Sequence, residues 1–186
     1  MDVFEAIQQR RSVKRFTGRA VARDEIERLL NAAVAAPNHR LTQPWRFYVL
    51  GPNAREAYGR ALGERKARKL EDAEKGRALR DTVAREHREL PAMLVIAVVR
   101  SDNPETAQED VAAAMMAIEN LALAAVAIGL GTHIKTGAVM DTEAARAAVG
   151  VPEDQRIVAI VNLGEPAELP PTKPRQSARE HTAWLP

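Results

Sequence analysis

Two mostly apolar runs, Met93–Val99 and Arg156–Leu163, constrain the fold of this chain more than any other feature of its sequence. Both are short and rich in Val and Ile, and their apolar residues follow one another instead of alternating with polar ones. Such runs indicate strands that are buried on both faces of a sheet. A sheet of this kind must be covered by helices. We therefore predict an α+β or α/β sandwich with one small sheet covered by helices.

The rest of the chain is mostly helical in pattern. A long apolar segment, Glu105–Ile128, predicts a central helix that ends at Gly129–Gly131. Caps and apolar spacing predict further helices at Val3–Gln9, capped by Asp2, at Asp24–Ala35, and at Ala54–Leu90, broken near Gly76. Another helix is predicted from its cap Asp141 to Val149. Extended segments are predicted at Arg46–Leu50 and Thr132–Thr136. No repeat or linker divides the chain. We expect one domain over residues 1–186, in which the Pro-rich residues 165–186 form an extended tail that lies on another surface.

Composition excludes several classes of protein. Lys and Arg are interspersed with Asp and Glu and the net charge is only +2, so we expect no nucleic-acid site. The absence of Cys excludes disulfides, thiolate metal sites and a Cys nucleophile. Glu119 and Asn120 interrupt the apolar stretch 111–131, which favours a buried helix over a membrane span. The N-terminal residues lack the form of a signal peptide, so we expect a cytoplasmic protein with no membrane partner.

Four cations and a hydroxyl are concentrated in the segment Arg10–Phe16. If this segment leaves the first helix in extended form, Arg10, Ser12 and Lys14 share one face. A guanidinium, a hydroxyl and an ammonium together suit a phosphate monoester. Basic residues that follow a helix C-terminus and complement its dipole give the same pattern. Spacing alone leaves both interpretations open.

A polar loop between Pro37 and Pro44 leads to Trp45 at the start of a predicted strand. Such a loop is rigid and rich in donors, and it could hold a planar polar ligand. The alternative is that His39 is an ordinary loop residue and that Trp45 belongs to the core.

Other motifs point away from common chemistries. The Gly129–Gly137 segment lacks the G-x-G-x-x-G spacing and follows a helix, so a dinucleotide fingerprint is not supported. No two histidines have the i, i+4 spacing of a helical zinc site, and there is no G-x-S-x-G hydrolase motif. Lys173 and Arg175 add a second pair of cations on the tail.

In this order and spacing, these segments resemble the nitroreductase family. The family signature R-R-S-x-K-x-F matches Arg10–Phe16, and the family loop P-x-x-x-x-x-Q-P-W-x-F matches Pro37–Phe47. The central helix that ends in G-L-G, the strand Arg156–Gly164 and the K-P-R sequence near the C-terminus also match. The short length and the basic residue after His39 are most similar to the minimal subgroup of this family.

The resemblance implies FMN as the cofactor, an α+β fold and an intertwined homodimer with two flavins at the subunit interface. Carried over by matching position, the implied flavin contacts are Arg10, Arg11, Ser12, Lys14, Pro37, His39, Ile134, Lys135, Thr136 and Arg175.

These implied contacts divide by their place on the flavin. The residues around Arg10 and Arg175 would hold the phosphate and ribityl groups, and Lys14 would lie near the pyrimidine. Residues 134–136 would line the other side of the ring, and the Pro37 loop would reach the flavin of the other subunit. Many members carry Ser and Asn in this loop, where this chain has Asn38 and Leu41.

The implied activity is that of an NAD(P)H-dependent nitroreductase. NAD(P)H would reduce FMN and leave, and a nitroaromatic, a quinone or a similar planar acceptor would then take the electrons in a ping-pong cycle. The chemistry would occur at the flavin N5, so we expect no catalytic side chain and no metal. Two alternatives remain: another flavin chemistry on the same fold, such as dehalogenation or flavin breakdown, and a non-enzymatic module that binds an acidic partner.

Overall fold

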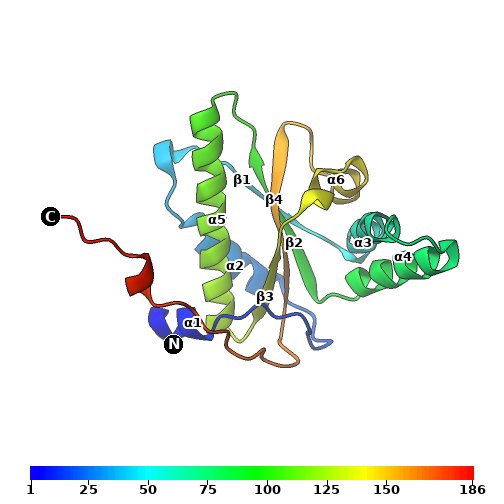
Figure 1. The fold of residues 1–186 in the computed structure, drawn as a ribbon, viewed down its shortest axis with the longest axis horizontal. Coiled ribbons are helices and arrows are strands. Elements are labelled where there is room, and N and C mark those ends of the chain that lie inside the picture. Colours follow the sequence, from blue (N-terminus) through cyan, green and yellow to red (C-terminus); the bar gives the residue numbers. More distant parts are fainter.

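The computed structural model describes the whole chain, Met1–Pro186, around one four-stranded antiparallel sheet. The strands are β1 (Trp45–Val49), β2 (Ala92–Val99), β3 (Gly131–Lys135) and β4 (Gln155–Gly164), and their order across the sheet is β1-β2-β4-β3. The two apolar runs therefore form the two central strands, as predicted. Because the strands are antiparallel and the helices lie between them in sequence, the fold is α+β (Figure 1).

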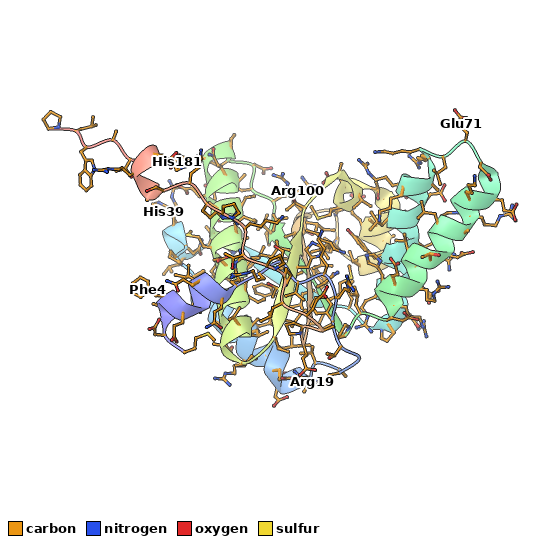
Figure 2. The ribbon with its side chains drawn as sticks, turned by 60° about the horizontal axis from the view of Figure 1, so that its bottom comes forward. Phe4, Arg19, His39, Glu71, Arg100 and His181 are labelled. Atoms are coloured by element: carbon orange, nitrogen blue, oxygen red, sulfur yellow. The ribbon has the colours of Figure 1, made fainter.

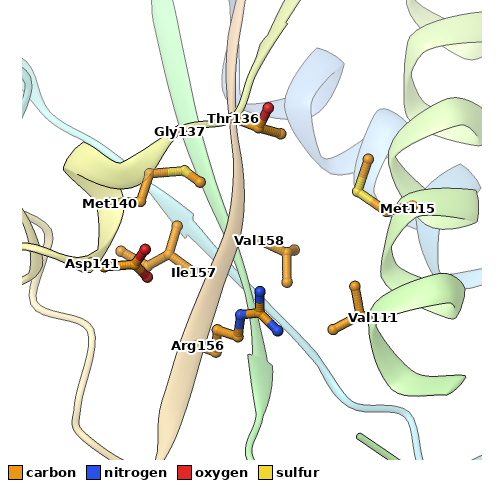
Figure 3. A pocket seen from close by; sticks show the side chains of 9 residues that line it. All are labelled: Val111, Met115, Thr136, Gly137, Met140, Asp141, Arg156, Ile157 and Val158. Carbon is orange, nitrogen blue, oxygen red and sulfur yellow. The ribbon is translucent and has the colours of Figure 1, made fainter. Parts of the chain in front are cut away.

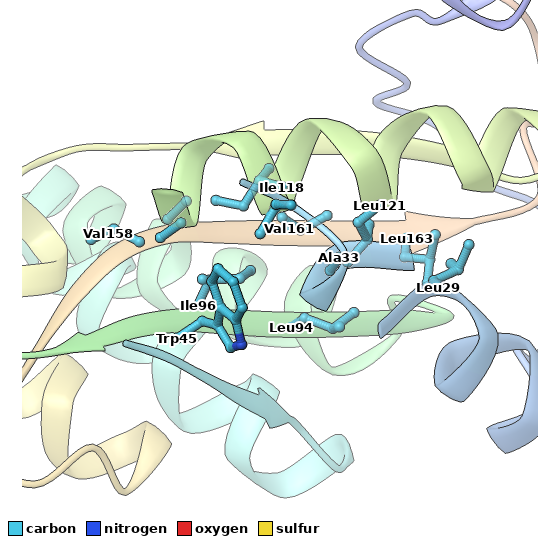
Figure 4. Packing of buried hydrophobic residues seen from close by; sticks show 14 of the residues in the cluster. Leu29, Ala33, Trp45, Leu94, Ile96, Ile118, Leu121, Val158, Val161 and Leu163 are labelled. Carbon is cyan, nitrogen blue, oxygen red and sulfur yellow. The ribbon is translucent and has the colours of Figure 1, made fainter. Parts of the chain in front are cut away.

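Helices cover both faces of the sheet. On one face lie α2 (Arg23–Val34) and α5 (Pro104–Ala127), and on the other lie α3 (Pro52–Ala67), α4 (Ala73–Arg88) and α6 (Glu143–Val149) (Figure 1). Alternate residues of β2 point to opposite faces, so Leu94 and Ile96 join the core under α5, whereas Met93 and Val95 join the core under α3 and α6. Figure 4 shows the first of these cores, with Trp45 packed beside Ile96. Trp45 is thus a core residue, as the alternative interpretation had it.

The long helix α5 is a core helix. By length and composition it could cross a membrane, with a mean hydropathy of 1.6 over its most apolar window. One side of it is buried against α2 and the sheet, including Ala114, Ile118 and Leu121. Small alanines on this side let the helix lie close to its neighbours. The prediction of a buried helix here is confirmed.

Two predicted boundaries are wrong. The helical segment 54–90 breaks at residues 68–72 and not at Gly76, because Asp72 accepts bonds from the backbone N–H groups of Glu74 and Lys75 and starts α4 there. The cap of α6 is Thr142 and not Asp141, since the Thr142 hydroxyl accepts the N–H of Ala145. Both errors displace a helix boundary by about one helical turn or less.

The two ends of the chain meet beside β3. Helix α1 (Val3–Gln9) has Asp2 as its cap, as predicted, and packs on α5. The following segment bridges β3 at Ser12–Thr132 and the tail at Phe16–Pro166. Residues 165–186 form an extended tail with one short 3-10 turn at Ala178–His181, and its end projects away from the molecule (Figure 1). The first part of this tail, up to Thr172, contacts the segment that follows α1, whereas Trp184 near its end is 91% exposed.

Candidate functional site

The basic segment after α1 is extended, as predicted. Val13 is buried, and its backbone N–H donates to the carbonyl of Thr132 at 2.9 Å. Its neighbours Ser12 and Lys14 are exposed, so their side chains stand on the outer side of the segment. A hydroxyl and an ammonium are therefore available beside the edge strand β3.

Arg10 and Arg11 have different partners. Arg10 is the C-cap of α1, but its guanidinium points to α5, where Nε lies 3.5 Å from Oε1 of Glu119. Arg11 donates to the carbonyls of Gln8 and Arg10 at 2.6 and 2.9 Å, and to the hydroxyl of Thr172 at 2.7 Å. Arg11 thus ties the end of α1 to the tail, while Arg10 faces the helix that borders the candidate site.

Two of the residues predicted to line the flavin ring, Ile134 and Lys135, lie on opposite faces of strand β3. Ile134 packs against the core under α5. Lys135 pairs with Ile160 and therefore lies on the other face, toward α3 and α4. Burial lowers the pKa of Lys135, and the charge of Lys66 on α3 lowers it further, while Glu86 acts in the opposite sense. Burial also lowers the pKa of His133, with further lowering by Lys135 and Lys14. Several cations thus surround this edge of the sheet.

The loop that follows Pro37 is strained and locked. Three of its residues other than Gly have positive φ: Arg40 at 59°, Leu41 at 51° and Gln43 at 44°. A left-handed residue of this kind costs about 1–2 kcal/mol, so other bonds must hold the loop.

Those bonds come from Asn38 and Thr42. Asn38 Oδ1 accepts the backbone N–H of Gln43 at 2.6 Å, and its Nδ2 donates to the Thr42 hydroxyl at 3.0 Å. The Thr42 hydroxyl in turn donates to Oδ1 of buried Asp110 on α5 at 2.5 Å. Asn38 stands where many family members carry Ser, and here its side chain serves the loop itself.

Two hollows flank α5. The first, of about 280 Å³, lies between α5, β4 and the turn after β3, and it is lined by Val111, Met115, Thr136, Gly137, Met140, Asp141, Arg156, Ile157 and Val158 (Figure 3). The second, of about 440 Å³, is lined by Pro37, Asn38, His39, Glu109, Ala112, Ala113 and Met116. The exposed residues Met115 and Met116 of α5 stand between them.

The first hollow exists because β3 is short. β3 pairs only with residues 160–164 of β4, so residues 155–159 of β4 have no strand beside them on that side. The turn after Thr136 and the side of α5 form the other walls. The predicted contact Thr136 thus lines a cavity with mostly apolar walls.

The structure therefore brings some of the predicted residues together and keeps others apart. Ser12 lies beside β3, and Thr136 follows the same strand, whereas Pro37 and His39 line the separate second hollow. Figure 2 shows His39 and Phe4 on the α1–α5 side, far from Glu71 at the tip of the α3–α4 hairpin. Arg175 is exposed on the tail and makes no side-chain bond within the chain. The sequence interpretation missed Glu119, Asp110 and Arg156, because their roles depend on which loop or strand ends beside them.

Comparison with known proteins decides the family. The sequence model of the Nitroreductase family matches residues 7–165. The chain belongs to the nitroreductase family. It is 30% identical over 179 residues to YfhC of Bacillus subtilis, which is named as an NAD(P)H nitroreductase; the match covers 95% of this chain and 90% of YfhC.

Solved structures agree with this assignment. A nitroreductase-like family protein from Bacillus cereus superposes with a TM-score of 0.85 at 28% identity, covering 100% of this chain and 96% of that one. A protein from Desulfovibrio desulfuricans, described as a nitroreductase in complex with FMN, gives a TM-score of 0.75 at 25% identity, covering 99% of this chain and 96% of that one. The predicted family and fold class are thereby confirmed.

Proposed function

We propose that this chain is an FMN-dependent NAD(P)H oxidoreductase that reduces nitroaromatics, quinones or similar planar acceptors by a ping-pong mechanism. The observation that carries the proposal is the arrangement along β3. A hydroxyl and cations lie beside one end of the strand, and a mostly apolar hollow opens at the other. The donor named for YfhC and the FMN bound to the Desulfovibrio protein support it.

The residues present fit the phosphate end of FMN. Ser12 and Lys14 are exposed on an extended segment, and Arg10 is held only by an ion pair with Glu119, whose side chain is 50% exposed. An exposed ion pair contributes at most about 1 kcal/mol, whereas a hydrogen bond to a charged group contributes about 1.5–3 kcal/mol. A phosphate could therefore replace Glu119 as the partner of Arg10. Arg11 and Arg175 would approach from the tail side.

The residues around the first hollow fit a flat ring. Val111, Met115 and Met140 give it apolar walls, and the backbone of Thr136 and Gly137 borders it. Lys14 and Lys135 supply positive charge near this edge of the sheet, which would stabilise the negative charge of a reduced flavin. When bound, FMN supplies the hydride chemistry at N5, so the protein needs no nucleophile of its own.

The second hollow and the exposed apolar residues suggest a homodimer. Pro37 and His39 lie apart from Ser12 within one chain, so they would serve the flavin of the other subunit. Phe4, Met115, Met116, Trp184 and Leu185 are exposed on α1, α5 and the tail, where a second copy of the chain would cover them. We place this dimer in the cytoplasm, with NAD(P)H and a small planar acceptor as its ligands.

The test begins with the purified protein. We expect a yellow protein that releases FMN on denaturation, identified by chromatography, and that oxidises NADH or NADPH when a nitroaromatic or a quinone is supplied. A colourless protein that binds no added FMN would instead favour the non-enzymatic binding module. Loss of FMN during turnover would favour flavin breakdown on the same fold.

A further inference from the structure

Arg156 occupies an unusual place for an arginine. It lies on a central strand of the sheet, opposite Val98 in the antiparallel register, and therefore on the face that α2 and α5 cover. Every other residue of β4 is buried, and Arg156 alone is exposed. β3 ends at the pair Lys135–Ile160, so no strand lies beside Arg156 on that side of β4.

The guanidinium of Arg156 has no partner within the chain. It makes no hydrogen bond and no ion pair, although most other arginines near the sheet do. Asp141 lines the same hollow, yet no ion pair joins the two side chains. In Figure 3 the guanidinium of Arg156 extends toward Val158 and Val111, while Asp141 lies across β4 from it.

The surroundings of this cation favour a flat anionic ligand. The walls formed by Val111, Met115 and Val158 exclude water from one side of the hollow, which strengthens any charge pair formed there. A guanidinium offers two parallel N–H donors that match a carboxylate or another planar pair of oxygens. The hollow thus combines contact area for an aromatic body with one fixed anchor for a negative group.

We propose that Arg156 is a specificity-determining residue that binds an anionic group, a carboxylate above all, on the planar electron acceptor. This inference rests on the proposed function, since it places the acceptor beside the flavin ring in the first hollow, with the anionic group of the acceptor at Arg156. The same anchor could be used by the 2′-phosphate of NADPH, so the experiment treats the acceptor and the donor separately.

The experiment compares two acceptors of matched shape, 4-nitrobenzoate and neutral 4-nitrobenzamide. For Arg156→Gln we expect KM for 4-nitrobenzoate to rise about tenfold, because the variant loses one partly exposed charge-assisted hydrogen bond. KM for 4-nitrobenzamide should change little. Arg156→Lys should recover part of this difference, and Arg156→Glu should enlarge it. The control is Arg77→Gln, which makes the same charge change on the exposed side of α4.

Binding is measured as well as turnover. Titration of benzoate into the oxidised protein should show an affinity about tenfold lower in Arg156→Gln than in the wild type, with no difference for benzamide. If the variant instead raises KM for NADPH but not for NADH, the anchor serves the donor and the proposal for the acceptor is overturned. An unchanged preference for 4-nitrobenzoate, or a change only in oligomeric state, also overturns it. Failure of the wild type to reduce either compound would refute the proposed function itself.

Discussion

The side chain of Arg10 bears on whether the basic segment after α1 complements the helix dipole or is free to bind phosphate, which spacing alone leaves open. It caps α1 but turns its guanidinium away from the helix end and toward Glu119, so complementing the helix dipole is not its main contact. Arg11 takes the carbonyl oxygens at the helix end instead. The interpretation as a complement to the helix end thus fits Arg11, and phosphate binding by Arg10 stays a prediction.

We predict that Arg10→Ala weakens FMN binding by roughly tenfold to more than a hundredfold, because a bond to phosphate contributes about 1.5–3 kcal/mol. Ser12→Ala should act in the same direction but less strongly, since it removes a neutral donor. Arg15→Ala is the control, because Arg15 pairs with Glu168 in an exposed position on the tail side. Melting is compared in the apo proteins, since bound FMN itself stabilises the fold.

Flavin fluorescence titration measures these affinities. A loss of only about 0.3–1 kcal/mol of apo stability in Arg10→Ala, with unchanged FMN affinity, would mean that the residue serves the helix end alone.

The burial of His87 predicts that stability depends on pH. Burial lowers its pKa, and Lys135 and Lys66 lower it further, although its Nδ1 lies 2.8 Å from the carbonyl oxygen of Val83. Above about pH 6.5 the ring is neutral in the folded and the unfolded chain, so it adds no pH dependence. Below that, the unfolded chain takes up a proton that the folded chain resists, and stability therefore falls as the pH falls.

We predict that His87→Gln removes part of this decline. Urea unfolding of the apo protein at several values between about pH 7.5 and 5 gives the free energy of unfolding at each pH. His181→Gln, at an exposed position on the tail, is the control. Parallel curves for wild type and His87→Gln would show that His87 does not contribute.

At the scale of elements, the loop 37–44 is held by few atoms. Thr42 supplies the only side-chain hydrogen bond to buried Asp110, and it also joins Asn38, which holds Gln43. Thr42→Val keeps the shape but removes the donor, so it should lower the free energy of unfolding by about 1–3 kcal/mol, as an unpaired buried polar group does. Because the freed loop carries His39, FMN affinity should fall as well.

Thr42→Ser keeps the hydroxyl and is the matched control. We expect it to retain wild-type stability and FMN affinity. If Thr42→Val also retains both, the bonds to Asn38 and Asp110 do not position the loop.

The α3–α4 hairpin depends on close approach of two helices. A Cβ at Gly63 would lie 2.8 Å from Cα of Arg80, which is backbone and cannot yield without separating the helices. Gly63→Ala should therefore lower stability by about 1–3 kcal/mol, more than the ~1 kcal/mol gained in helix propensity. Gly18→Ala, where nothing lies within 4 Å, should change stability by less than about 0.5 kcal/mol. Equal melting temperatures for the two variants would contradict this.

The elements differ in how far the sequence predicts them. β2 and β4 follow from their apolar runs, which burial on both faces of the sheet imposes at nearly every position, and α5 follows from its long apolar segment. The sequence predicts the break between α3 and α4 too late, because Gly76 breaks helices on average but here lies inside α4, near Ala67 of α3. The neighbouring sequence does not predict the positive φ angles of Arg40 and Leu41, since a hydrogen bond to the distant helix α5 maintains the loop. The sequence also does not predict the hollow beside Arg156, because this hollow depends on the residue at which β3 ends.

At the scale of the whole molecule, the residues of the candidate site lie apart from one another within a single chain. Thr136 and His39 border different hollows on α5, with the exposed Met115 and Met116 between them, and Ser12 lies at the other end of β3 from Thr136. The tail carries Arg175 and exposed Trp184 away from its own chain. A second copy that covers α5 would join these parts, so we predict that flavin binding and dimer assembly are linked.

The most direct test measures flavin and mass on the same sample. Light scattering and quantitative flavin release are performed on purified protein before and after removal and re-addition of FMN. The account predicts a dimer that holds FMN, one per chain, and that dissociates more readily without it. FAD as the released flavin, or a monomer that holds FMN at full occupancy, would contradict the account.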